Sequence, residues 1–306
     1  MWYNICENII KRLVTMNLLE ETKIIMKKYG VTANKRLGQN FLISDKAVND
    51  IVQSSNINKE DLVIEIGPGL GTLTKPLLDN AGKAILIELD DRMIEILEDR
   101  FKLYNNFEII NNDILKVNLN QLISKNKTGN IKYAKIVANL PYYITTPIIM
   151  KLLEDKLDID SITVMVQKEV AERLTAKPGE KIAGAITYAI NYYTIPNKVI
   201  DVDKTSFIPS PKVDSTVIKL DVLKEPTVKV KNEELMFKAI KAAFMQKRKT
   251  LLNGLTNSNL FGSKEEIKEI LKQLNIDPEI RGEKLTLQDF ANIADRIKLT
   301  HLYNPC

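Results

Sequence analysis

The chain has 306 residues, of which 44% are hydrophobic and 27% charged, so its composition is that of a folded globular protein and not of a disordered one. Its net charge of +5 indicates a polyanionic partner only weakly, because the excess of positive charge is small. The two cysteines, Cys6 and Cys306, stand at opposite ends and the single histidine is His301, which excludes a disulfide framework, a zinc site and a Ser-His-Asp triad.

The N-terminal residues carry neither a membrane span nor a secretory signal. No apolar run approaches the roughly 18 residues that a span needs, and residues 1–15 include Glu7, Lys11 and Arg12 without an apolar core. We therefore expect a cytoplasmic protein. Residues 1–15 match nothing that follows, and a more typical start begins at Met16, so they are either a dispensable extension or a misassigned start.

A short basic helix is predicted over residues 22–29, and a loop of residues 34–42, NKRLGQNFL, follows it. Lys35 and Arg36 in this loop are typical of a solvated surface or of a nucleic-acid contact. Asp45 is expected to cap a helix that ends near residue 54.

Residues 61–71, DLVIEIGPGLG, predict a buried strand followed by a glycine-rich turn. Glycine allows tight turning and close approach of a ligand to the backbone. The spacing is not the G-x-G-x-x-G of dinucleotide-binding proteins, and no P-loop lysine follows. The implied ligand is therefore a nucleoside without a polyphosphate.

Two further strands are predicted over residues 83–89 and 107–110. The first ends with Glu88, and the second is followed by Asp113. Glu88 lies about twenty residues beyond the glycines, where an acid can accept both hydroxyls of a ribose. Asp113 could accept from an adenine amine. Each acid alone would more often be a strand-end cap or a surface charge. Polar residues at the ends of successive strands make a shared binding site the better interpretation.

Residues 133–147, YAKIVANLPYYITTP, predict a fourth buried strand that ends at Asn139. An adenine N6 amine is a poor nucleophile because its lone pair is delocalised into the ring. The Asn139 side-chain oxygen and the Leu140 carbonyl could accept its two hydrogens and stabilise charge that develops on attack. Pro141 adds no competing donor, and Tyr142 offers a ring on which a base can stack. The alternative is an ordinary turn with a half-buried tyrosine.

The following segment predicts the rest of the sheet. Residues 161–166 form a fifth strand, and a helix starts near residue 168. Alternating side chains over residues 186–193 favour a strand, with a helix as the alternative. In the proline-rich loop of residues 206–212, Phe207 is more often a core residue than a base-stacking one. An edge strand is predicted over residues 216–222.

Beyond residues 223–226 the pattern becomes helical. A helix over residues 233–255 is expected to carry Lys247, Arg248 and Lys249, which could contact phosphates or form a solvated face. Capping boxes mark two later helix starts, at Ser263 with Glu266 and at Thr286 with Asp289.

Together these segments resemble the small-subunit ribosomal RNA adenine N6,N6-dimethyltransferases, over about residues 34–298. The resemblance implies an α/β fold of the class I (Rossmann-like) methyltransferase type, with a mostly parallel seven-stranded sheet and a small all-α C-terminal domain. The expected domains are an N-terminal extension with the basic helix (1–33), an S-adenosylmethionine-binding methyltransferase domain (34–224) and a helical RNA-recognition domain (225–306).

The resemblance also implies residue roles. S-adenosylmethionine would contact Asn40, Leu42, Gly67, Glu88, Asp113 and Asn139. The target adenine would contact Asn139, Leu140, Tyr142 and Phe207. For Phe207, the resemblance thus favours a contact with the base over a core position. RNA would bind Lys35, Arg36, Lys247, Arg248 and Lys249. Lys247 stands where the family usually has arginine, so the positive charge is kept but the planar, bidentate guanidinium is lost.

The implied reaction dimethylates N6 of two adjacent adenines near the 3′ end of 16S RNA in an assembling 30S particle. The enzyme would act as a monomer without a metal or a catalytic base, because the methylated amine becomes acidic on attack. The alternatives are a large-subunit (23S) enzyme of the macrolide-resistance type, a mainly non-catalytic assembly factor and a protein glutamine methyltransferase. The NLPYYITTP and QKRKTLLN segments favour the first interpretation.

Overall fold

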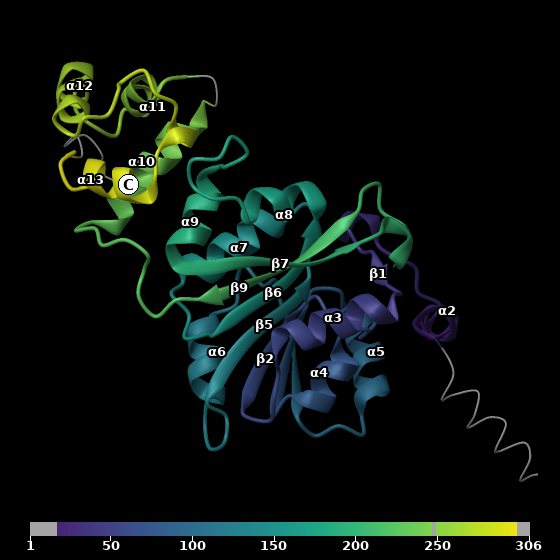
Figure 1. Cartoon of the computed structure of the whole chain (residues 1–306). Coiled ribbons are helices and arrows are strands. Elements are labelled where there is room, and N and C mark those ends of the chain that lie inside the picture. The colour runs from purple at the N-terminus through teal and green to yellow at the C-terminus, as the bar shows by residue number, and fades with distance from the viewer. Residues whose placement is uncertain (1–16, 247–248, 299–306) are drawn as a thin grey trace, which may run out of the picture. The chain divides into compact units, whose positions relative to one another are not determined.

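The computed structural model describes residues 17–246 and 249–298 (Figure 1). Backbone contacts divide the chain into two compact units: residues up to 171 together with 197–219, and residues 172–196 together with those from 220 onward. Residues 172–196 thus group with the helical unit, whereas the expected boundary after residue 224 placed them with the sheet. The functional division into three domains stays a prediction.

The main sheet has seven strands in the order β4-β3-β2-β5-β6-β9-β7. The pairs β2–β3, β3–β4, β2–β5 and β5–β6 are all parallel, which confirms the expected mostly parallel α/β sheet. The strands are β2 (Asp61–Ile66), β3 (Lys83–Glu88), β4 (Phe107–Asn111), β5 (Tyr133–Asn139), β6 (Ser161–Gln167), β7 (Thr194–Val202) and β9 (Ser215–Val222). A small antiparallel pair joins β1 (Phe41–Leu42) to β8 (Phe207–Ile208).

The central strand β2 is mostly apolar, with Asp61 and Glu65 as its charged residues. Every residue of β2 is buried, as expected for a parallel strand that packs on both faces. The helices of this part are α3 (Asp45–Ser55), α4 (Thr74–Asn80), α5 (Asp91–Phe101), α6 (Leu119–Asn126), α7 (Thr145–Glu154) and α8 (Lys168–Leu174). Ser44, and not Asp45 as predicted, caps α3, because its side chain accepts from the Ala47 amide.

The strand order reverses between β2 and β5. The chain proceeds from β2 to β3 and β4 on one side, whereas β5 and β6 lie on the other. Ligands of open α/β sheets bind beyond the carboxyl ends of the strands at such a switch point. Ile66 pairs with Ile87 and with Ala138, so β2, β3 and β5 end at the same level of the sheet.

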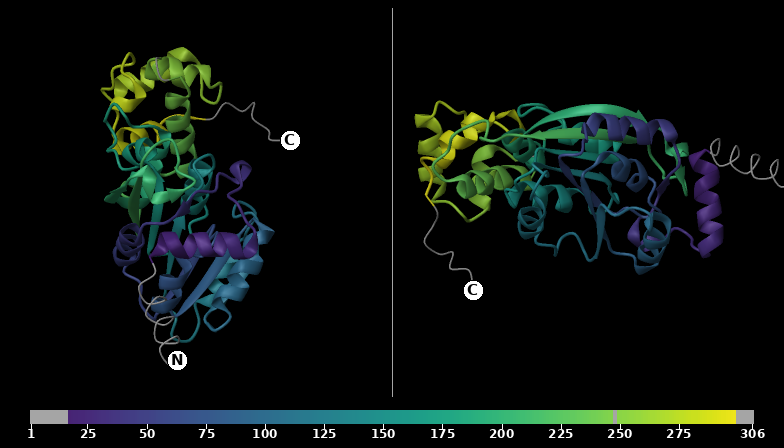
Figure 2. Two further views of the ribbon diagram at one scale, coloured as in Figure 1. Left: turned by 90° about the vertical axis from the view of Figure 1, so that its right-hand side faces the viewer. Right: turned by 90° about the horizontal axis from the view of Figure 1, so that it is seen from below.

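Helix α2 (Leu18–Tyr29) belongs to the sheet unit, and Figure 2 shows it in purple beside the blue segment that contains α5. Ile25 packs in one cluster with Leu70 of the glycine turn and Met93 of α5. Arg100 of α5 donates to the Leu70 carbonyl and pairs with Glu21 of α2. This helix, expected to be part of an extension, therefore braces the glycine-rich turn.

Two strand predictions were wrong. Residues 186–193 lie in a helix, α9 (Ala185–Tyr193), and most of its side chains are buried. A helix that is buried nearly all round loses its 3.6-residue periodicity, so chance alternation imitates a strand. Strand β9 lies between β6 and β7, so the edge strand is β7 and not residues 216–222.

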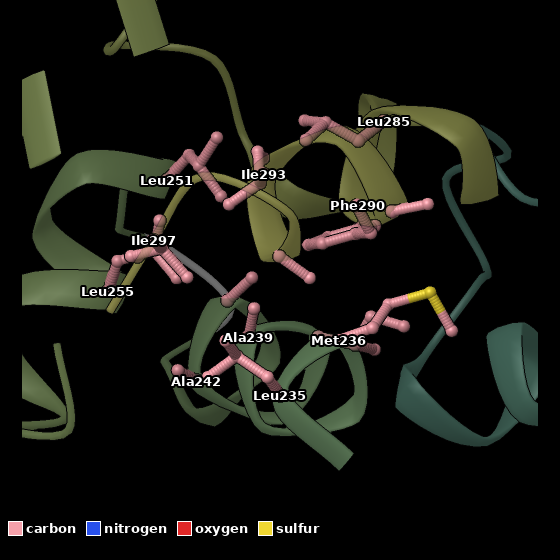
Figure 3. Close-up of a cluster of buried hydrophobic side chains, with 14 of the residues drawn as sticks. Leu235, Met236, Ala239, Ala242, Leu251, Leu255, Leu285, Phe290, Ile293 and Ile297 are labelled. Carbon is pink, nitrogen blue, oxygen red and sulfur yellow. The ribbon is translucent and has the colours of Figure 1, made fainter. Parts of the chain in front are cut away.

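The second unit is built on α9, α10 (Glu233–Met245), α11 (Leu251–Asn257), α12 (Lys264–Gln273) and α13 (Leu287–Ala294). Figure 3 shows its core, in which Met236, Leu251 and Phe290 come from three of these helices. Both predicted capping boxes are confirmed, at Ser263 and at Thr286.

The single helix expected over residues 233–255 was wrong. It ends at Met245, and Thr250 begins a new helix by accepting from the Asn253 amide. A β-carbon on Gly254 would lie 3.1 Å from the Ala242 carbonyl oxygen, so α11 packs closely against α10 instead of continuing it. No helix among residues 17–246 and 249–298 is long and apolar enough to cross a membrane.

Candidate active site

A cavity opens at the carboxyl ends of β2, β3, β4 and β5, where the strand order reverses. Its empty space, including the open solvent at its mouth, is about 1070 Å³. The lining includes all the sequence-predicted residues of this region, namely Asn40, Leu42, Gly67, Glu88, Asp113, Asn139, Leu140 and Tyr142. The sheet therefore brings together side chains that are far apart in the chain.

The glycine turn gives the cavity a backbone wall. Gly67 has a φ of +67°, and a β-carbon there would meet nothing within 4 Å, so the turn leaves open space next to its backbone. A positive φ is strained for any residue with a side chain, and glycine adopts it freely. The turn therefore allows a ligand to approach the main chain closely.

Glu88 connects the end of β3 to this turn. Its Oε2 accepts from the Gly69 amide at 3.0 Å, and its Oε1 accepts from the Leu89 and Asp90 amides at 2.8 Å each. Burial raises the pKa of Glu88, and the three amides counteract part of that rise. A carboxylate offers about four acceptor positions, so Glu88 keeps one for a ligand hydroxyl while it holds the turn.

Glu65 is a cavity residue that the sequence-based site prediction missed. It is 2% exposed, lies inside β2 and accepts from the Thr74 hydroxyl at 2.7 Å. Burial, with a smaller contribution from the nearby charge of Glu88, raises the pKa of Glu65 to about 8. The signal was present in the sequence, because a glutamate within the apolar run DLVIEI is out of place in an ordinary buried strand.

Asp113 follows β4 and is half-buried. Its Oδ1 accepts from the Leu115 amide at 3.0 Å. Within the described chain its Oδ2 has no hydrogen-bond partner, so one carboxylate oxygen is available to a ligand.

Asn139 ends β5, and its amide orientation is fixed by the loop that precedes β1. Its Nδ2 donates to the Asn40 carbonyl at 3.1 Å, so its Oδ1 is left as an acceptor. The Leu140 amide donates to the Met165 carbonyl at 3.2 Å, while no described residue donates to the Leu140 carbonyl. Two free acceptors from adjacent residues thus lie at the cavity wall, as binding of a primary amine requires.

Tyr142 also lines the cavity, and its hydroxyl is held by Ser215 of β9 at 2.7 Å. Burial raises the pKa of Tyr142, so its phenol stays protonated at neutral pH. The ring is therefore fixed in the cavity wall by its hydroxyl and is half-buried.

Phe207 is placed differently from the other predicted site residues. It does not line the cavity, its side chain is 3% exposed and it packs in a core cluster with Leu42 and Ile51. This is the core position that its residue type favoured before the family resemblance was considered. A contact with the target base stays a prediction, and this arrangement does not support it.

Lys35, Arg36 and Lys249, which were predicted to bind RNA, lie outside the cavity lining. Lys35 and Arg36 are exposed in a short 3₁₀ turn, η1 (Lys35–Leu37). Lys249 is exposed in the turn between α10 and α11, and not within a helix as expected. Lys247 and Arg248 lie outside the described residues.

Comparison with known proteins identifies the family. Residues 30–299 match the family model described as ribosomal RNA adenine dimethylase. The chain belongs to this family. A ribosomal RNA small subunit methyltransferase A from Alkaliphilus metalliredigens is 48% identical over 277 residues, covering 90% of this chain and 96% of that protein. The protein of the same description from Lachnoclostridium phytofermentans is 49% identical over 280 residues, covering 91% and 96%.

Solved structures agree with this assignment. A dimethyladenosine transferase from Plasmodium falciparum is similar with a TM-score of 0.69 and 29% identity, covering 83% of this chain and 95% of that one. The 23S rRNA methyltransferase ErmE has the same fold, with a TM-score of 0.63 and 23% identity over 84% of this chain and 99% of its own. The family and its fold make this protein a methyltransferase.

We predict that Glu65→Gln stabilises the protein at alkaline pH. The folded pKa of about 8 lies above the ordinary 4.5, so folding takes up a proton between these values. The contribution of Glu65 to the free energy of unfolding is then fully present below about pH 4.5 and is lost as the pH rises through 8. Urea unfolding without ligand should show the variant more stable than wild type at pH 8.5 and similar at pH 5.

The matched control is Glu95→Gln, which removes the same charge from an exposed position on α5. It should leave the pH dependence of stability unchanged. Equal behaviour of the two variants would contradict the assignment of a buried, protonated Glu65.

A second prediction concerns Phe207. Phe207→Ala should lower the free energy of unfolding by about 3–5 kcal/mol, as expected for truncation of a core aromatic, whereas Phe207→Leu should cost much less. Methylation by the Leu variant, measured where it is fully folded, tests the rival role. Loss of activity in a stable Leu variant would mean that the aromatic ring itself contacts the substrate.

Proposed function

We propose that this protein transfers methyl groups from S-adenosylmethionine to N6 of two adjacent adenines near the 3′ end of small-subunit ribosomal RNA. The observation that carries the proposal is the orientation of Asn139. Because its Nδ2 is engaged by the Asn40 carbonyl, its Oδ1 stands as an acceptor next to the Leu140 carbonyl. The relatives described as small-subunit rRNA methyltransferases support the choice of RNA.

The residues around the cavity fit S-adenosylmethionine. Glu88 retains an acceptor for a ribose hydroxyl, Asp113 retains Oδ2 for an adenine amine, and Gly67 leaves its backbone accessible. Asn40 and Leu42 belong to the same lining. When bound there, the cofactor supplies an electrophilic methyl group on a sulfonium.

The chain contributes acceptors and position. Asn139 Oδ1 and the Leu140 carbonyl would bind the two hydrogens of the adenine amine and draw it from planar toward tetrahedral geometry. These acceptors cost no reorganisation during the reaction because the strand end and the Asn40 contact fix them beforehand. Pro141 brings no competing N–H, and Tyr142 supplies a ring face fixed by Ser215. The amine proton, which becomes acidic on attack, leaves to water, so no side chain acts as a base.

We place the reaction on an assembling 30S particle in the cytoplasm, with the protein acting as a monomer. The exposed Lys35 and Arg36 on the sheet unit and the segment Lys247–Arg248–Lys249 on the helical unit would bind phosphates. The likeness to the 23S enzyme extends to the fold alone. Methylation of 30S particles or of 23S RNA therefore distinguishes the proposed function from that of a 23S enzyme.

Asn139→Ala tests the site and the function together. Wild type should methylate undermethylated 30S particles but neither naked 23S RNA nor protein. The variant should lose about 10²–10³ in rate, by analogy with deletion of one oxyanion-hole donor. Mass spectrometry of dimethyladenosine and sedimentation with particles measure methylation and binding separately. Binding should persist.

Asn120→Ala is the matched control, because its amide also donates to a backbone carbonyl, that of Asp155 at 2.8 Å, but away from the cavity. It should leave the rate unchanged. Full methylation by Asn139→Ala would mean that Asn139 is only a turn residue, and it would contradict the proposed mechanism.

Neutralising Lys247, Arg248 and Lys249 together should weaken particle binding and leave cofactor binding intact. Each lost phosphate contact should remove roughly 0.9 from the slope of log K against log salt, if the duplex value applies. The control removes the same charge from exposed positions of the same unit, Lys264, Lys268 and Lys272 on α12. If both triple variants show the same slope, the basic segment is only a solvated surface.

A further inference from the structure

Tyr143 is an exposed aromatic residue at the cavity and has no part in the site described above. Its side chain is 60% exposed, yet it lines the cavity together with its neighbour Tyr142. Tyr142 is half-buried and its hydroxyl is held by Ser215. A tyrosine that is this exposed beside the cavity leaves much of its apolar surface in water, which favours a ligand that covers it.

The Tyr143 ring rests on the loop that precedes β1. A β-carbon on Gly38 would lie 3.2 Å from Cδ1 and 3.3 Å from Cε1 of Tyr143, so the ring lies closely against the Gly38 backbone. Gly38 has a φ of +63°, which is strained for a residue with a side chain. The glycine therefore both makes the turn and leaves space for the ring.

That loop is held in place on three sides. The Asn34 side chain caps the turn by accepting from the Arg36 amide at 3.0 Å. Gln39 donates to Asp90 at 2.8 Å, and the Asn40 carbonyl accepts from Asn139 at 3.1 Å. The surface that supports Tyr143 is therefore tied to the ends of β3 and β5, and its position relative to Asn139 is fixed.

The turn that the ring contacts also carries two cations. Lys35 and Arg36 belong to the same turn as Gly38, since the Gly38 amide donates to the Lys35 carbonyl at 3.2 Å. Both side chains are exposed, and neither forms an ion pair with another residue in the described parts of the chain. An exposed aromatic ring and exposed cations carried on one loop are the usual combination for single-stranded nucleic acid, in which bases stack and phosphates pair.

We propose that Tyr143 is a second base platform, on which the nucleotide next to the target adenine stacks while the target occupies the cavity. The proposal rests on the proposed function and adds a substrate-binding residue to it. Tyr142 and Tyr143 would then hold successive bases of one RNA strand, the first at the cavity wall and the second at its mouth. Holding the neighbouring base at the mouth keeps the second target adenine close to the cavity after the first has been modified.

The test compares Tyr143→Ala with Tyr143→Phe in steady-state methylation of undermethylated 30S particles. The Ala variant should raise the KM for the particle roughly 5- to 150-fold, the range that loss of one base–aromatic stack implies. The Phe variant should match wild type, because stacking needs the ring and not the hydroxyl. Cofactor affinity, measured by calorimetry, should be the same in all three proteins.

Tyr133→Ala is the matched control. Tyr133 is 43% exposed and begins the strand at whose other end Asn139 lies, so it is a comparable exposed tyrosine away from the cavity. It should leave the KM unchanged. The platform is refuted if Tyr143→Ala behaves like this control, if Tyr143→Phe is as impaired as Tyr143→Ala, or if the Ala variant loses cofactor affinity. Failure of the wild type to methylate the particle would instead refute the proposed function.

Discussion

The common level at which the parallel strands end is the constraint on which the site depends. Ile66 pairs with Ile87 on one side and with Ala138 on the other, which brings Gly67, Glu88 and Asn139 to one edge of the sheet. These residues are far apart in the chain, and no local interaction would bring them together. A slip of one residue in either pairing would turn every side chain of a strand to the opposite face. A slip would also shift the end of that strand by one residue relative to its neighbours, so Gly67, Glu88 and Asn139 would no longer lie at the same level.

The loop of residues 34–40 completes the site from outside the sheet. Gln39 binds Asp90 beyond β3, and the Asn40 carbonyl binds the Asn139 amide beyond β5. The loop thereby determines which end of the Asn139 amide faces the cavity, since an amide that donates to a carbonyl must direct its oxygen elsewhere. Helix α2 supports the neighbouring glycine turn through Arg100 and Leu70. The N-terminal segment thus takes part in building the site.

Two carboxylates lie close together at the base of the cavity in different environments. Glu88 is satisfied by three backbone amides, whereas Glu65 is buried with one hydroxyl donor and has its pKa raised to about 8. Burial without a neighbouring cation disfavours the ionised form of an acid, and a positively charged ligand would favour it.

The sequence alone predicted strands β2 to β6, the glycine turn, the two capping boxes and the polar residues at the strand ends that line the cavity. It did not predict strand β7, the position of β9 inside the sheet or the cavity residue Glu65. The predicted features are local: periodicity, turn chemistry and polar residues at strand ends can be recognised without knowing what packs against them. Phe207 was open to two interpretations, because an apolar ring serves a core and a binding site equally well, and only packing against Leu42 and Ile51 places it in the core.

Tertiary structure decided the rest. Residues 186–193 form a helix because burial on most sides removes the polar face that would have revealed it. Lys249 lies between two helices because Thr250 starts a new helix and Gly254 allows α11 to approach α10. The role of Glu65 and the exposure of Tyr143 depend on distances between strands and loops. A linear pattern does not contain those distances, because side chains from different elements become neighbours only when the chain is folded.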